Sequence, residues 1–301
     1  MLTGAKETDV MTASDQSKRT RVILALLAVY LSWGSTYLVI RIALVELPPL
    51  FMMGIRFFLF GIGIYGYLRM RGAPNPSLSE WSRSAVIGIF LMLGGSAGVA
   101  YAEQWVSSGL AALMIATTPL WTVLFAGIWR RWPNRLEWAG LLIGLVGIVV
   151  LNFEGDLRAS PLGAALLIVA AMSWAFGSVW SQQMKLPRGM MAGAAQMITG
   201  GAVVLLFSLA IGERIMAVPT WRSISAVLYL GIVGSLAGFT AYTYLLKQVR
   251  PALATSYAYV NPVIAVMLGI WFAGERIALP GVIAMLIILS GVVLVAFGQR
   301  R

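Results

Sequence analysis

The chain has 301 residues, of which 59% are hydrophobic and 11% are charged, and its formal net charge is +11. Soluble domains are about half apolar and about a quarter charged, so this composition excludes a water-soluble fold and predicts an integral membrane protein. The chain has no cysteine and no histidine, which excludes disulfides, thiolate metal sites and imidazole acid–base chemistry. We therefore expect neither a metal nor a cofactor.

Residues 1–20 are polar and carry no cleavable signal pattern, because the apolar run that follows is too long for a signal peptide. We expect a cytoplasmic tail here, with Met11 as an alternative start to Met1. Ten apolar segments of about 20 residues follow, each long enough to cross the core of a bilayer. They are residues 22–43, 50–69, 84–103, 109–129, 136–153, 161–182, 190–211, 224–246, 252–272 and 279–298. The predicted fold is an all-α integral membrane protein with ten transmembrane helices.

Lysine and arginine mark the cytoplasmic loops, because they are costly to translocate. With the N-terminus inside, sixteen of the 22 lysines and arginines lie on the inside and four on the outside, while Arg41 and Arg56 lie within spans. The four on the outside are Arg158, Arg214, Arg222 and Arg276. This asymmetry predicts that both termini are cytoplasmic. Because the basic residues are spread over short loops, we expect no nucleic-acid partner.

The second half of the chain repeats the first. Residues 85–151 and 226–297 read alike. Among the matching pairs are Ser32-Trp33 with Ser173-Trp174 and Thr118-Pro119 with Asn261-Pro262. Each half, 21–155 and 156–301, holds five predicted spans, an odd number, so the second half enters the membrane from the opposite side. Such an inverted repeat is typical of transporters.

Three stretches carry a resemblance to a known family. They are Trp33-Gly34-Ser35-Thr36-Tyr37, Gly54-Ile55-Arg56-Phe57, and the run from Pro251 to Pro262 that leads into Gly274-Glu275-Arg276. Over about residues 22–298 the chain resembles the EamA-type members of the drug/metabolite transporter superfamily, and among them the YddG-like and YedA-like exporters. The resemblance implies a ten-helix basket in the bacterial inner membrane that exports amino acids, often aromatic, and related metabolites or toxic cations.

Trp33 and Trp174 fall near the middle of their spans, although tryptophan prefers the membrane interfaces. An indole N–H at this depth needs an acceptor, so we expect both side chains to face the interior of the bundle. There they either hold a flat cargo or pack against neighbouring helices.

Pro119 and Pro262 lie at matching mid-span positions, and each follows a polar residue, Thr118 and Asn261. Proline removes a backbone donor and frees the carbonyl one turn earlier, which in lipid must find a partner or line a cavity. This pattern predicts paired kinks beside a midplane binding site. Kinks with a purely structural role are the alternative.

Three tyrosines, Tyr101, Tyr242 and Tyr257, add aromatic hydroxyls to the predicted cargo site, and Ser35 adds a small hydroxyl from the first motif. Tyr257 lies four residues before Asn261 and so shares its helix face. The alternative for these tyrosines is the aromatic belt at the membrane interfaces.

Arg56 lies inside the second span, and a charge within the membrane predicts a functional role. Its guanidinium holds a substrate carboxylate, pairs with Glu103, or extends to the interface; the corresponding stretch of the second half offers Gln196 instead. We assign Arg56 and Glu103 to a gating or charge role.

No P-loop is present, and every acidic residue lies in a tail, a loop or near the end of a span. We therefore expect facilitated export by alternating access, in which the two halves rock around a cavity formed by spans one, three, four, six, eight and nine. The expected partners are a small-molecule substrate and the bilayer, with no obligate protein partner. No enzymatic activity is expected, because no metal motif or paired carboxylate lies at membrane depth. A multidrug or organic-cation exporter and a channel are the alternatives.

Overall fold

The structure is a computed structural model that describes residues 13–106, 111, 114–152, 160–216, 218–273 and 279–298. Within these ranges the chain is helical, without β-strands. Seven helical segments of the described chain are long and apolar enough to cross a membrane, and Thr118–Ile128 is a shorter apolar helix. The all-helical fold is thus confirmed, while the count of ten spans stays a prediction. Met1, Met11, Arg158 and Arg276 lie outside the described residues.

The helices follow the predicted spans. In chain order they are α1 (Ala13–Leu44), α2 (Pro49–Met70), α3 (Leu78–Gly88), η1 (Ile89–Ala97), α4 (Gly98–Ala102), α6 (Thr118–Ile128), α7 (Arg135–Asn152), α8 (Pro161–Ser181), α9 (Met190–Ala210), α10 (Trp221–Tyr229), η2 (Leu230–Phe239), α11 (Thr240–Gln248), α12 (Pro251–Ala254), α13 (Tyr257–Ala273) and α14 (Leu279–Gly298). The segments η1 and η2 are π-helical and lie within the third and eighth predicted spans. Because π-helical turns are rare, their presence at corresponding places is a feature that the two halves share.

The ninth predicted span, expected over 252–272, is broken between α12 and α13 by a turn at Thr255 and Ser256. The hydroxyl of Thr255 donates to the carbonyl of Pro251 at 2.9 Å, and that of Ser256 donates to the carbonyl of Leu253 at 2.8 Å. The same two carbonyls also accept from backbone N–H groups, Pro251 from Thr255 at 3.1 Å and Leu253 from Ser256 at 3.3 Å. The two hydroxyls thus find acceptors within the turn, as buried polar groups require.

The two mid-span prolines have different settings. Pro262 lies inside α13, as the predicted kink requires. Pro119 instead is the second residue of α6, which begins at Thr118 and covers only the second part of the predicted span 109–129. The N–H groups of a first helical turn have no partner within the helix, so proline fits there without losing a hydrogen bond. Pro119 therefore starts a helix, which corrects the prediction of a mid-helix kink.

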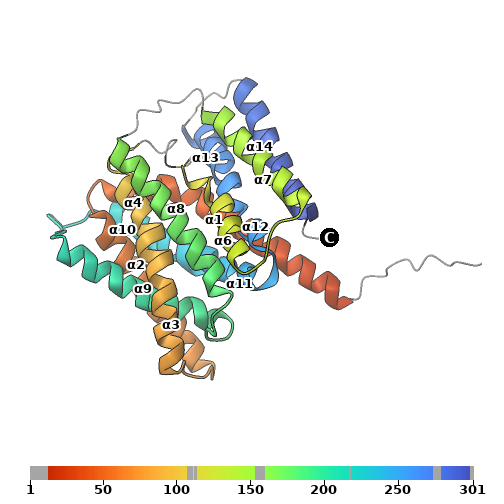
Figure 1. The fold of residues 1–301 in the computed structure, drawn as a ribbon. Helices are drawn as coiled ribbons and strands as arrows, with labels where there is room; N and C mark the ends of the chain where they lie inside the picture. Colours follow the sequence, from red (N-terminus) through yellow and green to blue (C-terminus); the bar gives the residue numbers. More distant parts are fainter. Residues whose placement is uncertain are drawn as a thin grey trace, which may run out of the picture.

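Two helix pairs pack along their length, α2 with α9 and α7 with α14, and the second pair is seen at the right of Figure 1. Glycines permit both contacts. An added Cβ would lie 2.6 Å from the backbone nitrogen of Phe58 at Gly201, and 2.6 Å from the carbonyl oxygen of Gly140 at Gly291. Small residues allow such close backbone approach between membrane helices. Each pair unites one helix from each predicted half.

Hydrogen bonds at the helix ends reinforce the same two pairs. The Glu213 carboxylate, just after α9, accepts from the backbone N–H groups of Leu50 at 3.2 Å and Phe51 at 2.8 Å in the first turn of α2. The Asn134 amide nitrogen, just before α7, donates to the carbonyl of Gly298 at the end of α14 at 2.7 Å. Both pairs are thus joined through side chains as well as through close backbone contact.

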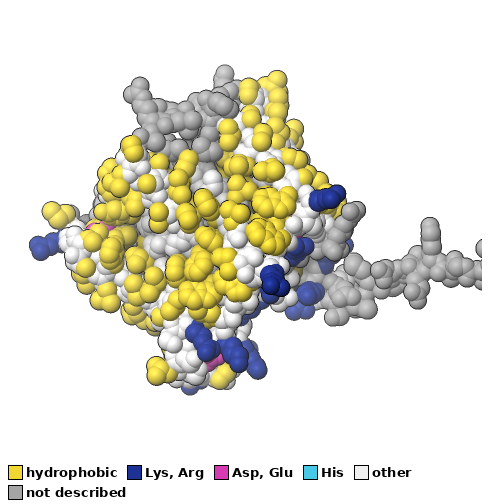
Figure 2. All heavy atoms as spheres, in the orientation of Figure 1, with side chains coloured by type: hydrophobic (Ala, Val, Ile, Leu, Met, Phe, Trp, Pro, Cys, Tyr) yellow, Lys and Arg dark blue, Asp and Glu magenta, His cyan; other side chains and the backbone are white. Residues whose placement is uncertain are grey.

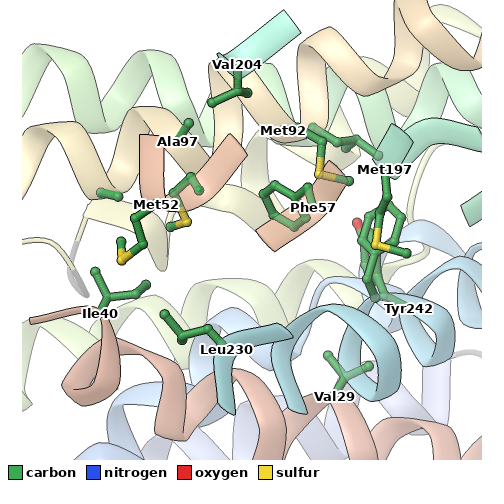
Figure 3. Packing of buried hydrophobic residues seen from close by; sticks show 14 of the residues in the cluster. Val29, Ile40, Met52, Phe57, Met92, Ala97, Met197, Val204, Leu230 and Tyr242 are labelled. Carbon is green, nitrogen blue, oxygen red and sulfur yellow. The ribbon is translucent and has the colours of Figure 1, made fainter. Parts of the chain in front are cut away.

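Helix α1 packs against η2, α11 and α13, while α8 packs against η1, α4 and α6. The largest hydrophobic cluster lies among α1, α2, η1, α9, η2 and α11. Figure 3 shows Met52 and Phe57 of α2 opposite Ile40 of α1 and Leu230 of η2. Side chains from both predicted halves therefore share one core.

The surface suits a lipid environment. Large apolar side chains such as Leu31, Leu206 and Leu286 are 62%, 66% and 63% exposed. Figure 2 shows hydrophobic side chains over most of one face, with lysine and arginine gathered mainly at its lower and right margins. Exposed apolar area on this scale indicates contact with a membrane or with a partner protein. Because seven described helical segments are long and apolar enough to cross a bilayer, we favour the membrane.

Candidate functional site

A cavity of about 90 Å³ lies among the helices and is lined mainly by apolar atoms. Its wall contains residues of α1, η1, α8, η2 and α13, and also Ile115 and Thr118 from the fourth predicted span. All six spans predicted to form the cavity contribute. The sequence reasoning missed α2, which adds Met53, Arg56 and Phe57. One water needs about 10–15 Å³ on this measure, so the cavity holds a few waters, and larger cargo requires its walls to separate.

Trp33 is the centre of an aromatic cluster at this cavity. Its ring centroid lies 5.3 Å from Trp174, 4.6 Å from Tyr257 and 5.1 Å from Tyr242. The contacts with Trp174 and Tyr257 are edge-to-face, at interplanar angles of 84° and 83°, an arrangement that aromatic rings favour. The structure therefore brings together residues that the sequence placed on four different spans.

Both indole N–H groups already have acceptors inside the protein. Trp33 Nε1 donates to the carbonyl of Gly234 at 3.0 Å, and Trp174 Nε1 donates to the hydroxyl of Tyr242 at 3.1 Å. The Tyr242 hydroxyl also lies 2.6 Å from the hydroxyl of Ser178. The two indoles therefore offer a cargo their rings and not a hydrogen-bond donor. Tyr242 does not line the cavity but fixes one of its walls.

Each indole also packs on a glycine of the opposite half. An added Cβ would lie 2.7 Å from Trp174 at Gly95 of η1, and 2.5 Å from Trp33 at Gly238 of η2. Any side chain at either glycine would displace the ring. The π-helical segments thus set the positions of the two tryptophans.

Asn261 supplies uncommitted polar atoms. Its side chain is buried and lines the cavity, and neither its amide oxygen nor its amide nitrogen has a hydrogen-bond partner within the described chain. Thr118 also lines the cavity, but its hydroxyl donates to the carbonyl of Ile115 at 2.6 Å. Tyr37 lies close to Asn261 and to Glu103 and is a cavity residue that the sequence reasoning missed. Its spacing of four residues from Trp33, which puts both on one helix face, was the available signal.

Arg56 reaches the cavity from α2 and is only 5% exposed. Its Nη2 lies 3.4 Å from the hydroxyl of Ser96, and its guanidinium carbon lies 4.5 Å from the ring centroid of Phe57. Nε and Nη1 have no hydrogen-bond partner among the described residues. No ion pair between Arg56 and Glu103 is found among the described residues.

Glu103 follows α4 and is also buried, without a hydrogen-bond partner for either carboxylate oxygen among the described residues. It does not line the cavity. Arg41 of α1 is the charged group that acts on it electrostatically. Two buried ionisable side chains, Arg56 and Glu103, therefore occupy separate places and do not form a pair among the described residues.

Two candidates lie elsewhere. The Ser35 hydroxyl does not line the cavity. It forms hydrogen bonds with the carbonyls of Leu31 and Ser32 and lies 2.8 Å from the Tyr229 hydroxyl. Tyr101 packs edge-to-face on Trp105 at 5.1 Å and does not line the cavity either. Of the predicted cargo residues, Trp33, Thr118, Trp174, Tyr257 and Asn261 share the cavity, together with Arg56.

The chain is similar to known membrane transporters. The model of the EamA-like transporter family matches residues 20–153 and again residues 161–297. The chain is 45% identical over 276 residues, 91% of this chain and 90% of the relative, to the "Uncharacterized inner membrane transporter YedA" of Escherichia coli (strain K12). It is 24% identical, over 92% of this chain and 95% of the relative, to a "Probable amino-acid metabolite efflux pump" of Salmonella typhimurium. A solved crystal structure shares the fold at a TM-score of 0.76, covering 95% of this chain and 99% of its own, at 22% identity.

Proposed function

Because the chain belongs to the EamA-like transporter family, we propose that it exports small metabolites, with amino acids including aromatic ones as the leading candidates. The observation that carries this proposal is the cavity walled by Trp33, Trp174 and Tyr257 with the free amide of Asn261 at its side. Flat side chains fit aromatic walls, and a buried amide without partners suits a polar group of a cargo. The Salmonella relative, named for amino-acid metabolite efflux, supports this choice of substrate.

The proposed setting is the inner membrane, as in the name of the Escherichia coli relative, with ten spans as two inverted repeats over 21–155 and 156–301. Two observations support the repeat. The family model matches the chain twice, and packed elements correspond across the halves: α1 packs on η2 and α13, as α8 packs on η1 and α6. Exchanging each element for its counterpart in the other half converts one set into the other.

The topology can be tested with single cysteines, since the chain has none of its own. Cysteines placed at Arg71 and Lys185 should react with impermeant reagents only from the cytoplasmic side, and one at Gly212 only from outside. One reversal at a labelled site with normal expression would contradict the ten-span arrangement.

The function can be tested in liposomes with labelled aromatic and aliphatic amino acids. A carrier working by alternating access should saturate and show counterflow. Flux without saturation and without counterflow would instead identify a channel. Counterflow of organic cations, with none of amino acids, would favour the multidrug alternative.

The coupling can be tested in the same liposomes. We propose facilitated export, in which wild-type protein and Glu103→Gln both retain flux without a pH gradient. Loss of wild-type flux when the gradient collapses would contradict this and make the buried Glu103 the leading proton carrier.

A further inference from the structure

The charged side chain at the cavity is an arginine. Arg56 is the one charged side chain among its lining residues in the described chain, and it is almost fully buried. A buried ion is expensive unless it is paired and hydrogen-bonded, and in a membrane an unpaired charge marks a substrate or ion path. No described residue supplies a carboxylate to the cavity wall, so the positive charge of Arg56 is uncompensated there.

The hydrogen-bonding capacity of Arg56 is also largely unused. A guanidinium has five N–H donors and no acceptor. The Ser96 hydroxyl accepts from Nη2 at a long 3.4 Å, whereas Nε and Nη1 have no partner within the described chain. Nη1 faces the part of the cavity wall formed by Gly234 and Thr36: a Cβ added at Gly234 would lie 3.7 Å from Nη1 and 3.2 Å from the Thr36 methyl carbon. Free donors and positive charge thus coincide at the cavity wall.

We propose that Arg56 selects cargo that carries a carboxylate, so that this carrier takes small carboxylic acids, amino acids among them, and rejects cations that lack a carboxylate. The proposal rests on the proposed export function and specifies the chemistry of its substrate. Guanidinium–carboxylate hydrogen bonds are charge-assisted and about twice as strong as neutral ones. The carboxylate supplies the missing counter-charge, which explains why Arg56 lacks a partner inside the protein.

The remaining groups divide the cargo between them. The Asn261 amide lies beside the Tyr37 hydroxyl and forms no hydrogen bond of good geometry within the described chain, so it can accept from an ammonium or donate to a second oxygen. The rings of Trp33, Trp174 and Tyr257 contact the apolar part. An aromatic amino acid has all three features, whereas an aromatic amine would place its ammonium in a cavity that already holds Arg56. The aromatic rings alone would attract such a cation. The positive charge of Arg56 is therefore the feature that favours carboxylates over cationic amines.

The test uses ligands that share a phenyl ring and differ in whether they carry a carboxylate, an ammonium group or both: phenylalanine, 3-phenylpropanoate, phenylalaninamide and phenethylamine. Binding to the purified full-length protein in detergent is followed by the fluorescence of the cavity tryptophans, and counterflow is measured in liposomes. We expect the two carboxylates to bind at least about ten-fold more tightly than the amide and the amine, as charge-assisted hydrogen bonds require. Equal or tighter binding of phenethylamine would overturn the proposal.

Variants assign the effect to one side chain. Arg56→Met should weaken carboxylate binding at least about ten-fold and leave phenethylamine unchanged or improved, while Arg56→Lys should restore part of the carboxylate preference. Arg214→Met, which removes an exposed arginine outside the cavity, should leave all four ligands unchanged. Unchanged carboxylate binding in Arg56→Met would overturn the proposal. Should Arg56→Met fail to fold, the wild-type ligand series decides alone.

The two proposals fail in different ways. Saturable amino-acid counterflow that is insensitive to Arg56→Met would leave the export function standing and refute the role of Arg56. Arg56-dependent binding of 3-phenylpropanoate, without amino-acid counterflow, would support the carboxylate site and refute amino acids as cargo. Absence of carboxylate-dependent binding across the whole series would refute the carboxylate site.

Discussion

The two predicted halves of the chain build the cavity with matching scaffolds and different chemistry. Each contributes a tryptophan, Trp33 or Trp174, that packs on a glycine of the π-helical segment in the other half. The anchors differ, because one indole donates to a backbone carbonyl and the other to the hydroxyl of Tyr242. The shared positions set the shape of the cavity, and the unshared ones set its chemistry.

The polar residues show the difference most clearly. Arg56 lines the cavity, while its counterpart Gln196 is buried elsewhere. Tyr242 of the eighth predicted span is enclosed by aromatic rings, while Tyr101 of the corresponding third span packs beside Trp105. A duplicated scaffold therefore need not produce a symmetric site, and a cargo bound here meets distinct groups on its two sides.

The largest effects are expected where the halves are alike. Gly201→Ala and Gly291→Ala should each destabilise the protein by about 1–3 kcal/mol, because the new Cβ meets backbone atoms of the partner helix. The thermal unfolding midpoint in detergent measures this. Gly63→Ala is the control, since nothing lies within 4 Å of its added Cβ. A large loss in one helix pair and none in the other would show that the pairs are not equivalent.

A smaller effect is expected from the indoles. Trp33→Ala and Trp174→Ala should raise the half-saturation concentration for aromatic cargo by a few-fold to about thirty-fold, the equivalent of about 0.5–2 kcal/mol of ring contacts. Aliphatic cargo should be affected less, and the two variants should have similar effects, because each indole contacts three rings. Unchanged transport kinetics in two well-folded variants would make both indoles packing residues only.

Tyr242 and Tyr101 differ in whether the side-chain hydroxyl forms hydrogen bonds within the described structure. Tyr242→Phe should lower the stability by about 1 kcal/mol, because the N–H of Trp174 loses its acceptor and the Ser178 hydroxyl loses a partner. Tyr101→Phe should be nearly neutral, as no hydrogen bond of its hydroxyl is found in the described structure. Thermal midpoints of the two variants provide the comparison, and equal losses would contradict it.

The smallest effect concerns helix capping. α3 is capped locally by Ser77 and Glu80, whereas the first residue before α10, Thr220, donates its backbone N–H to Glu46 of the α1–α2 connection at 2.8 Å. The Thr220 backbone N–H, followed by the hydroxyls of Ser223 and Thr220, lowers the pKa of Glu46 below its usual 4.5. A carboxyl group with a lowered pKa in the folded protein stabilises the fold at pH values above its ordinary pKa in the unfolded chain. This contribution is lost as the pH falls through the lowered pKa.

Glu46→Gln should therefore reduce the thermal midpoint slightly at neutral pH, and the difference from wild type should vanish in acid. Glu46 is exposed, so only a small shift is expected. A difference that grows as the pH falls would contradict the assigned direction.

Periodic and long-range features were predictable to different degrees. The spans followed from hydropathy, since a bilayer demands about 20 apolar residues, and α14 begins and ends where expected, at residues 279 and 298. The break at Thr255 and Ser256 was not foreseen, because a continuous apolar run does not show where the backbone leaves the helical conformation. The convergence of Trp33, Trp174 and Asn261 was expected from the placement of aromatic residues and prolines within the spans and from the family resemblance. The place of Arg56 in the wall was left open, since only the packing of α2 against the rest decides where its head group lies.

The glycine-lined contacts also bear on how the molecule can move. α2 with α9 and α7 with α14 are joined backbone to backbone, and Glu213 and Asn134 tie their ends. Such joints slide with difficulty, because no flexible side chain separates the two backbones. Since each joint links one helix of either predicted half, each tightly packed pair belongs to both halves. We therefore expect bending to occur in other elements, such as the π-helical segments and the break at Thr255 and Ser256, and not within these two helix pairs.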